Sequence, residues 1–327
     1  MTVMVIGGAG YIGAHVVRLL QQGGREAVVV DDLSTSRPER VGNSPLEILD
    51  AAAPDSPEKL QGIIRKYGVD AVIHFAARKQ VGESMEKPLW YYSQNVGGLV
   101  NVLSAMEATG VRQFIFSSSA AVYGIPQNVD MVIEETPCEP INPYGRTKLI
   151  GEQILSDCAR AWGLSYAALR YFNVAGAGWS DLGDPAILNL IPMVFDRLER
   201  GEQPRVFGND YPTDDGTCIR DYVHVRDLAQ AHISAMTLLT EPGAEHVFNV
   251  GTGVGGSVLE VLEAIAAASG KDTTPIIEPR RAGDPPRLVA SAKKIERDLD
   301  FVSTAGLDEI VDSAWEAWKV TKARELS

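Results

Sequence analysis

The chain has 327 residues, 45% hydrophobic and 22% charged, which suits a globular protein of one large or two joined lobes. Its net charge of −13 argues against electrostatic binding of nucleic acid or an anionic membrane. The three cysteines are far apart in the sequence and lack the spacing of metal ligands, so we expect reduced thiols, no bound metal and a cytoplasmic location. No stretch reaches the ~20 apolar residues of a membrane helix, so we expect no association with a membrane.

The first half alternates short apolar runs with helical patterns. Apolar runs at 3–6, 27–30, 71–75, 113–116 and 166–170 predict strands, and helices are expected at 11–22, 57–66, 89–109 and 143–162. Short buried strands that alternate with helices are typical of parallel sheets. The sequence therefore predicts an α/β fold with a doubly wound parallel Rossmann sheet.

After Arg170 the chain becomes richer in Gly, Pro, Asn and Asp. Helices are expected at 190–200, 225–236, 254–269 and 306–322, and an apolar run at 246–250 is expected to return to the large sheet. These features predict an NAD-binding domain at 1–170 with a return segment near 221–252. Residues 171–220 and 253–327 are expected to form a smaller, interleaved lobe that binds the substrate.

A glycine-rich loop lies between the first run and the first helix. Gly7, Gly10 and Gly13 permit a tight turn and a close approach of backbone amides to a diphosphate at the helix N-terminus. Asp31 ends the next run, where a carboxylate accepts hydrogen bonds from a ribose diol and repels a 2′-phosphate. This combination predicts a site for NAD rather than NADP, and Asp50 either reaches the adenine or caps its own strand.

Tyr144 and Lys148 are one turn apart on the helix expected at 143–162. A phenol is a poor base at neutral pH, but a nearby ammonium group lowers its pKa, so that it can take a proton from a substrate hydroxyl. The run before this helix ends in Ser117-Ser118-Ser119, and Ser119 is the candidate for a hydroxyl that faces the substrate. These three side chains and the glycine loop resemble the extended branch of the short-chain dehydrogenases/reductases.

Further motifs resemble the UDP-glucose 4-epimerases of that branch over nearly the whole chain. They are FAARKQVGES after the third run, YFN after the fifth, and FGNDYPT, DGT and RDY in the second half. The resemblance implies that NAD stays bound while a UDP-hexose (UDP-galactose or UDP-glucose) is inverted at C4 through a transient 4-keto sugar. It also implies a homodimer, in which the helices at 89–109 and 143–162 form the interface.

The resemblance assigns roles to three groups of residues. Tyr144, Lys148 and Ser119 are expected to be catalytic. The cofactor is expected to contact Gly7, Gly10, Tyr11, Ile12, Gly13, Asp31, Asp32, Ser34, Asp50, Ala51, Phe75, Ala76, Ala77, Lys79, Gln94, Tyr144, Lys148 and Phe172. The UDP-sugar is expected to contact Ser119, Tyr144, Asn173, Asn189, Leu190, Phe207, Arg220, Arg281 and Asp284.

Two positions bear on alternative functions. In related dehydratases the residues at these positions resemble Thr-Asp-Glu, whereas this chain has Ser119-Ala120-Ala121. Alanine supplies neither the acid nor the base that an elimination requires. At Leu288 the family often carries either a large tyrosine or a smaller residue, and bulk there closes the sugar site to an N-acetyl group. Leucine is intermediate, so epimerisation of UDP-N-acetylhexosamines stays a second reading, beside other NAD-dependent nucleotide-sugar enzymes of this fold.

Overall fold

The computed structural model describes residues 1–126, 130–281 and 283–325. These residues divide into two compact units. The first comprises residues 1–124, 138–170 and 229–248, and the second 125–137, 171–228 and 249–327.

The first unit is built around a seven-stranded sheet, as far as the described residues show, in the order β10-β6-β5-β4-β1-β2-β3. Strands β3 to β6 pair in parallel along this order, and β10 lies beside β6. The strands are β1 (Thr2–Ile6), β2 (Glu26–Asp31), β3 (Leu46–Ile48), β4 (Val69–His74), β5 (Gln113–Ser117), β6 (Ser165–Tyr171) and β10 (Glu245–Val250). The parallel Rossmann sheet and the return of the 246–250 run to it are confirmed.

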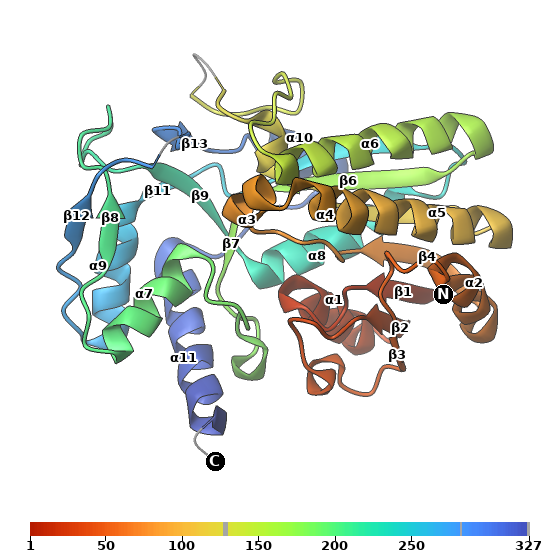
Figure 1. Ribbon diagram of the computed structural model, residues 1–327, viewed down its shortest axis with the longest axis horizontal. Helices are drawn as coiled ribbons and strands as arrows, with labels where there is room; N and C mark the ends of the chain where they lie inside the picture. The colour runs from red at the N-terminus through yellow and green to blue at the C-terminus, as the bar shows by residue number, and fades with distance from the viewer. Residues whose placement is uncertain (127–129, 282, 326–327) are drawn as a thin grey trace. The chain divides into compact units, whose positions relative to one another are not determined.

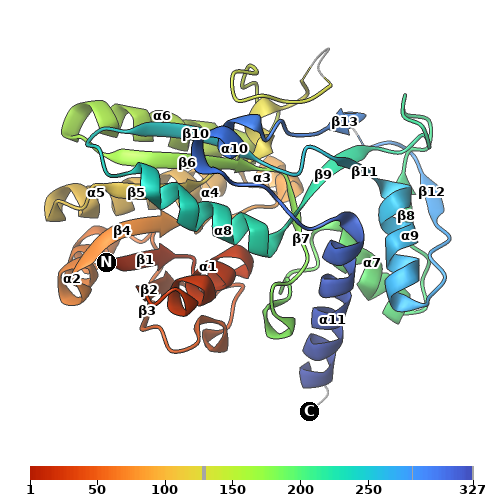
Figure 2. The same cartoon turned by 180° about the vertical axis from the view of Figure 1, so that it is seen from behind.

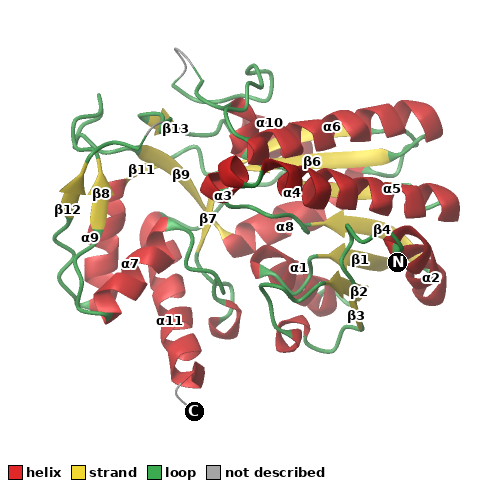
Figure 3. Ribbon diagram, viewed as in Figure 1, coloured by secondary structure: helices red, strands yellow, loops and turns green. Residues whose placement is uncertain are grey.

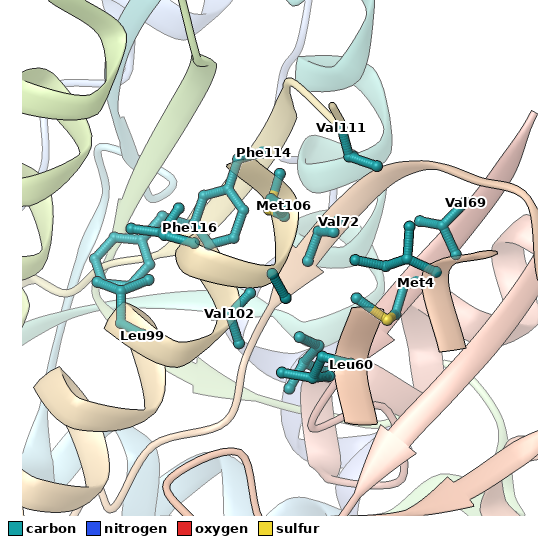
Figure 4. Close-up of a cluster of buried hydrophobic side chains, with 14 of the residues drawn as sticks. Met4, Leu60, Val69, Val72, Leu99, Val102, Met106, Val111, Phe114 and Phe116 are labelled. Carbon is teal, nitrogen blue, oxygen red and sulfur yellow. The ribbon is translucent and has the colours of Figure 1, made fainter. Parts of the chain in front are cut away.

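Helices cover both faces of this sheet (Figures 1 and 2). One face carries α2 (Ser56–Tyr67), α5 (Gly98–Thr109) and α6 (Pro143–Trp162), and the other carries α1 (Tyr11–Gln22) and the end of α8 (Val225–Ala235). The core between β1, β4, β5 and the helices α2 and α5 contains the labelled side chains of Figure 4, among them Met4, Leu60, Val72, Phe114 and Met106.

The single helix expected at 89–109 is interrupted. The structure has α4 (Pro88–Tyr91), then a π-helical segment (Tyr92–Gly97), then α5, with α3 (Val81–Glu86) before them. Periodicity does not reveal this segment, because its six residues make little more than one turn, which is too short to show a period of its own.

The second unit contains two smaller sheets, coloured yellow in Figure 3. In one, β9 (Ile219–His224) pairs with β7 (Asn173–Ala175), β11 (Gly255–Ser257) and β13 (Arg287–Leu288). In the other, β8 (Arg205–Phe207) pairs with β12 (Ile276–Glu278). The unit also contains α7 (Leu190–Glu199), α9 (Val258–Ser269), α10 (Lys293–Leu299) and α11 (Leu307–Glu325).

Candidate functional site

The glycine loop follows β1 and opens α1, as the sequence predicts. Gly7 has φ +78°, and a side chain there would come within 2.7 Å of the Ala76 backbone nitrogen, so the first turn requires glycine. Gly10 precedes the helix without a side chain to cap it, and the first turn from Tyr11 to Ala14 contains no charged residue. The helix N-terminus therefore presents backbone N–H groups and positive potential, which suits a diphosphate.

Asp31 lies at the carboxyl end of β2 and is buried. One carboxylate oxygen accepts from the Ala9 backbone N–H at 2.9 Å, and the other accepts from the Leu33 N–H and the Ser36 hydroxyl. The carboxylate thus links the glycine loop to the loop after β2. Asp50, in contrast, is exposed and accepts from the Ala52 N–H at 2.8 Å, as a strand-end cap would.

The three catalytic candidates come from two adjacent elements of the first unit. Tyr144 and Lys148 lie in the first two turns of α6, which begins at Pro143 because Asn142 accepts from the Gly145 N–H at 2.8 Å. Ser119 follows β5 and caps a short 3-10 helix. The Ser119 side chain lies close enough to the Tyr144 hydroxyl to affect its pKa, so the three predicted residues lie near one another.

Burial controls the ionisation of this triad. It raises the pKa of Tyr144, and the hydrogen bond with Ser119 lowers that pKa in part. Burial also lowers the pKa of Lys148 to about 7, although the Glu152 carboxylate opposes this change. The ammonium group donates to the Ser117 carbonyl at 2.7 Å and lies 6.0 Å from the centre of the Tyr144 ring. An additional positive charge beside Tyr144 would therefore be needed to make its phenolate accessible near neutral pH.

A buried ion pair between Glu152 and Arg170 lies next to the three catalytic candidates, and no sequence motif indicated it. The Arg170 guanidinium contacts both oxygens of Glu152, the shortest distance being 2.6 Å, and donates to the Tyr123 hydroxyl at 2.9 Å. Glu152 also accepts from the Ser118 hydroxyl. Burial lowers the pKa of Arg170, but its bonds and charge pairing with Glu152 raise that pKa more. The ion pair joins α6 to β6, and the Ser118 hydroxyl bond to Glu152 holds the end of β5 against α6, near Ser119 and Lys148.

The substrate candidates lie in the second unit, around β9 and β8. Arg220 on β9 is the register partner of Leu288 on β13, and it contacts the Asp284 carboxylate at 3.4 Å and the Pro285 carbonyl at 2.8 Å. The Arg281 guanidinium lies 3.8 Å from the centre of the Phe207 ring. These contacts gather Arg220 with Asp284 and Arg281 with Phe207 within this unit.

The other predicted substrate and cofactor residues do not form a comparable cluster of charged contacts. Asn189 donates to the Asp184 carboxylate at 3.1 Å and precedes Leu190 at the start of α7. Asn173 on β7 is the register partner of Tyr222. The remaining candidates range from buried to exposed: Ala51 and Phe172 are buried, Phe75, Ala76 and Ala77 half-buried, and Lys79 exposed.

Two further properties hold for the part of the chain that the structure describes. No helix there is long and apolar enough to cross a membrane. No group of three or more His, Cys, Asp or Glu side chains is placed there to hold a metal ion.

Comparisons with known proteins agree with one another. Residues 3–251 match the family described as "NAD dependent epimerase/dehydratase family". A UDP-glucose 4-epimerase of Azospirillum brasilense is 44% identical, over 96% of this chain and 91% of the relative. The crystal structure of UDP-glucose 4-epimerase from Brucella ovis in complex with NAD has a TM-score of 0.90 at 43% identity, covering 96% of this chain and 97% of that one. The UDP-Glc/GlcNAc 4-epimerase from Campylobacter jejuni has a TM-score of 0.86 at 38% identity, covering 98% and 99%.

Proposed function

The chain belongs to the NAD dependent epimerase/dehydratase family, and we propose that it is an NAD-dependent epimerase that interconverts UDP-galactose and UDP-glucose by inverting C4. The main support for this proposal is that Ser119, Tyr144 and Lys148 lie close together at the end of β5. Similarity to UDP-glucose 4-epimerases over nearly the whole chain supports it.

The first unit contains the groups that NAD requires. The glycine loop and the α1 N-terminus would hold the diphosphate, and the Asp31 carboxylate would accept from an adenosine ribose hydroxyl. We propose that the other cofactor residues predicted from the sequence make the further contacts with NAD. When bound, NAD would supply the group that accepts a hydride from C4 of the sugar and gives it back.

Tyr144 acts as the general base and then as the general acid. It removes the proton of the sugar 4-hydroxyl while hydride leaves C4, and Ser119 donates a hydrogen bond to the same oxygen. Lys148 and the positive charge of the oxidised cofactor stabilise the phenolate. After the 4-keto sugar turns over, Tyr144 returns a proton to the oxygen, and the configuration at C4 is inverted.

The second unit supplies the proposed nucleotide contacts. Arg220 and Arg281 would bind the diphosphate with planar, bidentate donors. Phe207, Asn189 and Leu190 would hold the uridine, and Asn173 and Asp284 complete the proposed set. Because Arg220 already pairs with Asp284, its guanidinium is oriented before the diphosphate arrives. A firm hold on the nucleotide leaves the sugar free to turn.

One incubation tests this function. Purified protein mixed with UDP-galactose, without added cofactor, should produce UDP-glucose in the NMR spectrum and show NADH absorbance from bound cofactor. A product that has lost water would instead indicate a dehydratase, and unchanged UDP-galactose would refute the epimerase. The alanines at 120 and 121, within the 3-10 helix behind Ser119, argue against elimination because they carry no acid or base.

Epimerisation of UDP-N-acetylglucosamine is a second candidate function. Leu288 is half-buried beside Arg220 in the β13–β9 pairing, and the Campylobacter jejuni relative is named for both sugars. We expect Leu288→Gly to raise kcat/KM for UDP-N-acetylglucosamine relative to UDP-galactose by about tenfold or more, since removal of a few methylene groups changes selectivity on that scale. Both substrates are measured on the same preparation. Equal, negligible rates of wild type and variant on UDP-N-acetylglucosamine would count against this function.

We further propose a homodimer that uses the helices at 88–109 and 143–162. Its support is the exposed apolar surface on α3 to α5, where Met85, Leu89 and Trp90 are 60%, 83% and 38% exposed and Val100 is 44% exposed. Leu89→Glu should shift the mass measured by light scattering from dimer toward monomer, because it places a charge in an apolar contact. The matched variant Val302→Glu, exposed in the second unit, should stay dimeric; a monomeric wild type would refute the proposal.

We also propose a cytoplasmic location, because Cys138, Cys158 and Cys218 form no disulfide bond. Recovery of the protein from an oxidising compartment in cell fractionation would contradict it.

A further inference from the structure

Arg78 follows β4 and joins three of the cofactor candidates. Its guanidinium pairs with the Asp32 carboxylate at 2.9 Å, donates to the Ser34 hydroxyl at 2.7 Å, and donates to the Gln94 side-chain oxygen at 3.1 and 3.2 Å. The sequence motifs gave this arginine no function. A planar guanidinium is suited to such a junction, because it presents several donors in fixed directions.

Both ends of this junction are held in place. The Asn95 side chain accepts from the Arg78 backbone N–H at 2.8 Å and donates to its carbonyl at 3.0 Å, and the Trp90 ring lies 5.1 Å from the guanidinium carbon. At the other end, the Asp32 carboxylate accepts from the Ser34 N–H at 2.9 Å. Burial raises the pKa of Asp32, and its bonds with Ser34 and Arg78 lower that pKa more. The carboxylate is therefore held in its charged form opposite the arginine.

The order of the strands shows which part of the sheet lies under the contacts between Arg78 and Asp32. β1 lies between β4 and β2, and its carboxyl end carries the glycine loop. In a parallel sheet the loops after all three strands emerge at the same edge. A bridge from the loop after β4 to the loop after β2 therefore passes over the end of β1, where the cofactor diphosphate is proposed to lie.

We propose that Arg78, Asp32, Ser34 and Gln94 form a clasp that closes over the bound dinucleotide and slows its release. This inference rests on the proposed NAD site. The epimerase reaction gives the clasp a purpose, because a cofactor that accepts a hydride must remain bound until it returns the hydride. Arg78 is thus a positioning residue for the cofactor, and the Arg78–Asp32 ion pair is what must open before NAD leaves.

The experiment measures the rate at which the purified holoenzyme releases NAD, with free NAD consumed by a coupled dehydrogenase. Arg78→Met and Asp32→Asn should each accelerate release about tenfold, because each removes one side of a charge-assisted bridge. The double variant should release NAD no faster than either single variant, since the two side chains act through one contact. Turnover of Arg78→Met should fall on dilution and recover when NAD is added, which a purely structural defect would not do.

Three results of the release experiment would overturn the clasp. Release from Arg78→Met at the wild-type rate would overturn the clasp. So would slower release from Asp32→Asn, which would mean that the freed arginine binds the diphosphate directly. Additive effects in the double variant would mean two independent ligands and would also overturn it. Arg65→Met, an exposed arginine on α2 that donates to Gln61, is the matched control and should release NAD at the wild-type rate.

Two controls distinguish loss of the clasp from misfolding of the variant and from failure of the proposed epimerase function. If Arg78→Met does not fold, as judged by thermal unfolding with excess NAD, Arg78→Lys replaces it. That variant keeps the charge but replaces the planar guanidinium and its fixed donors by a single ammonium nitrogen, so faster release is again expected, and wild-type release would overturn the clasp. UDP-galactose turnover by the wild type reports the proposed function independently, so an epimerase with no clasp is distinguished from a protein that is not an epimerase.

Discussion

Replacing Tyr144 by phenylalanine should lower kcat by about two to four orders of magnitude, the contribution typical of a positioned general acid–base group. The variant loses only the hydroxyl, which is the atom that exchanges a proton with the sugar 4-oxygen in the proposed mechanism. The buried ring at the start of α6 keeps its packing, and the glycine loop is untouched. We therefore expect thermal unfolding and the amount of bound NAD to match those of the wild type.

The control is Tyr67→Phe. Tyr67 ends α2, and its hydroxyl donates to the Glu47 carboxylate at 2.8 Å, so the variant also removes one hydrogen-bonded phenol. Its turnover should stay close to that of the wild type. Turnover of Tyr144→Phe near the wild-type value would remove Tyr144 from the role of the base, whatever the overall reaction proves to be.

The second large effect is on stability. Glu152→Gln should lower the free energy of unfolding by about 3 kcal/mol or more, because removal of one partner of a buried ion pair leaves the other charge without compensation. Glu152 and Arg170 are each 6% exposed, so water does not replace the lost contacts. Urea unfolding followed by circular dichroism measures the change.

Two comparisons isolate the ion pair as the cause. Glu107→Gln, at an exposed position on α5, should change stability by less than about 0.5 kcal/mol, as surface substitutions generally do. Replacement of both partners, as Glu152→Gln with Arg170→Met, should recover part of the loss because no unpaired charge remains. Equal stabilities of Glu152→Gln and the wild type would show that the pair does not hold α6 and β6 together.

Local signals in the sequence were sufficient for much of the first unit. α6 begins at Pro143 and ends at Trp162 as predicted, because Asn142 caps its start and Gly163 adopts a left-handed conformation at its end. The glycine loop likewise combines a strand, a turn and a helix within one short segment. Ser119 and Tyr144 could be associated before the structure was known, because both follow from motifs at the ends of predicted elements.

The features that were missed depend on contacts between distant parts of the chain. The Glu152–Arg170 pair joins α6 to β6, and the Arg78 clasp joins the loops after β4 and β2, neither of which has a local signature. The short strands around β9 were missed because two- and three-residue strands are too short to show periodicity. The contacts of Asp284 with Arg220 and of Asn189 with Asp184 could not be predicted either, because they depend on the tertiary fold.

In the proposed reaction, a hydride leaves C4 of the sugar and returns to the same carbon within one enzyme molecule. The direct measurement is NMR of the product formed from UDP-galactose that carries deuterium at C4, incubated in ordinary water. The UDP-glucose formed should retain the deuterium at C4, because the hydride never exchanges with solvent. UDP-glucose that carries hydrogen at C4 would refute hydride transfer, since it would mean that the carbon loses a proton to water rather than a hydride to the cofactor.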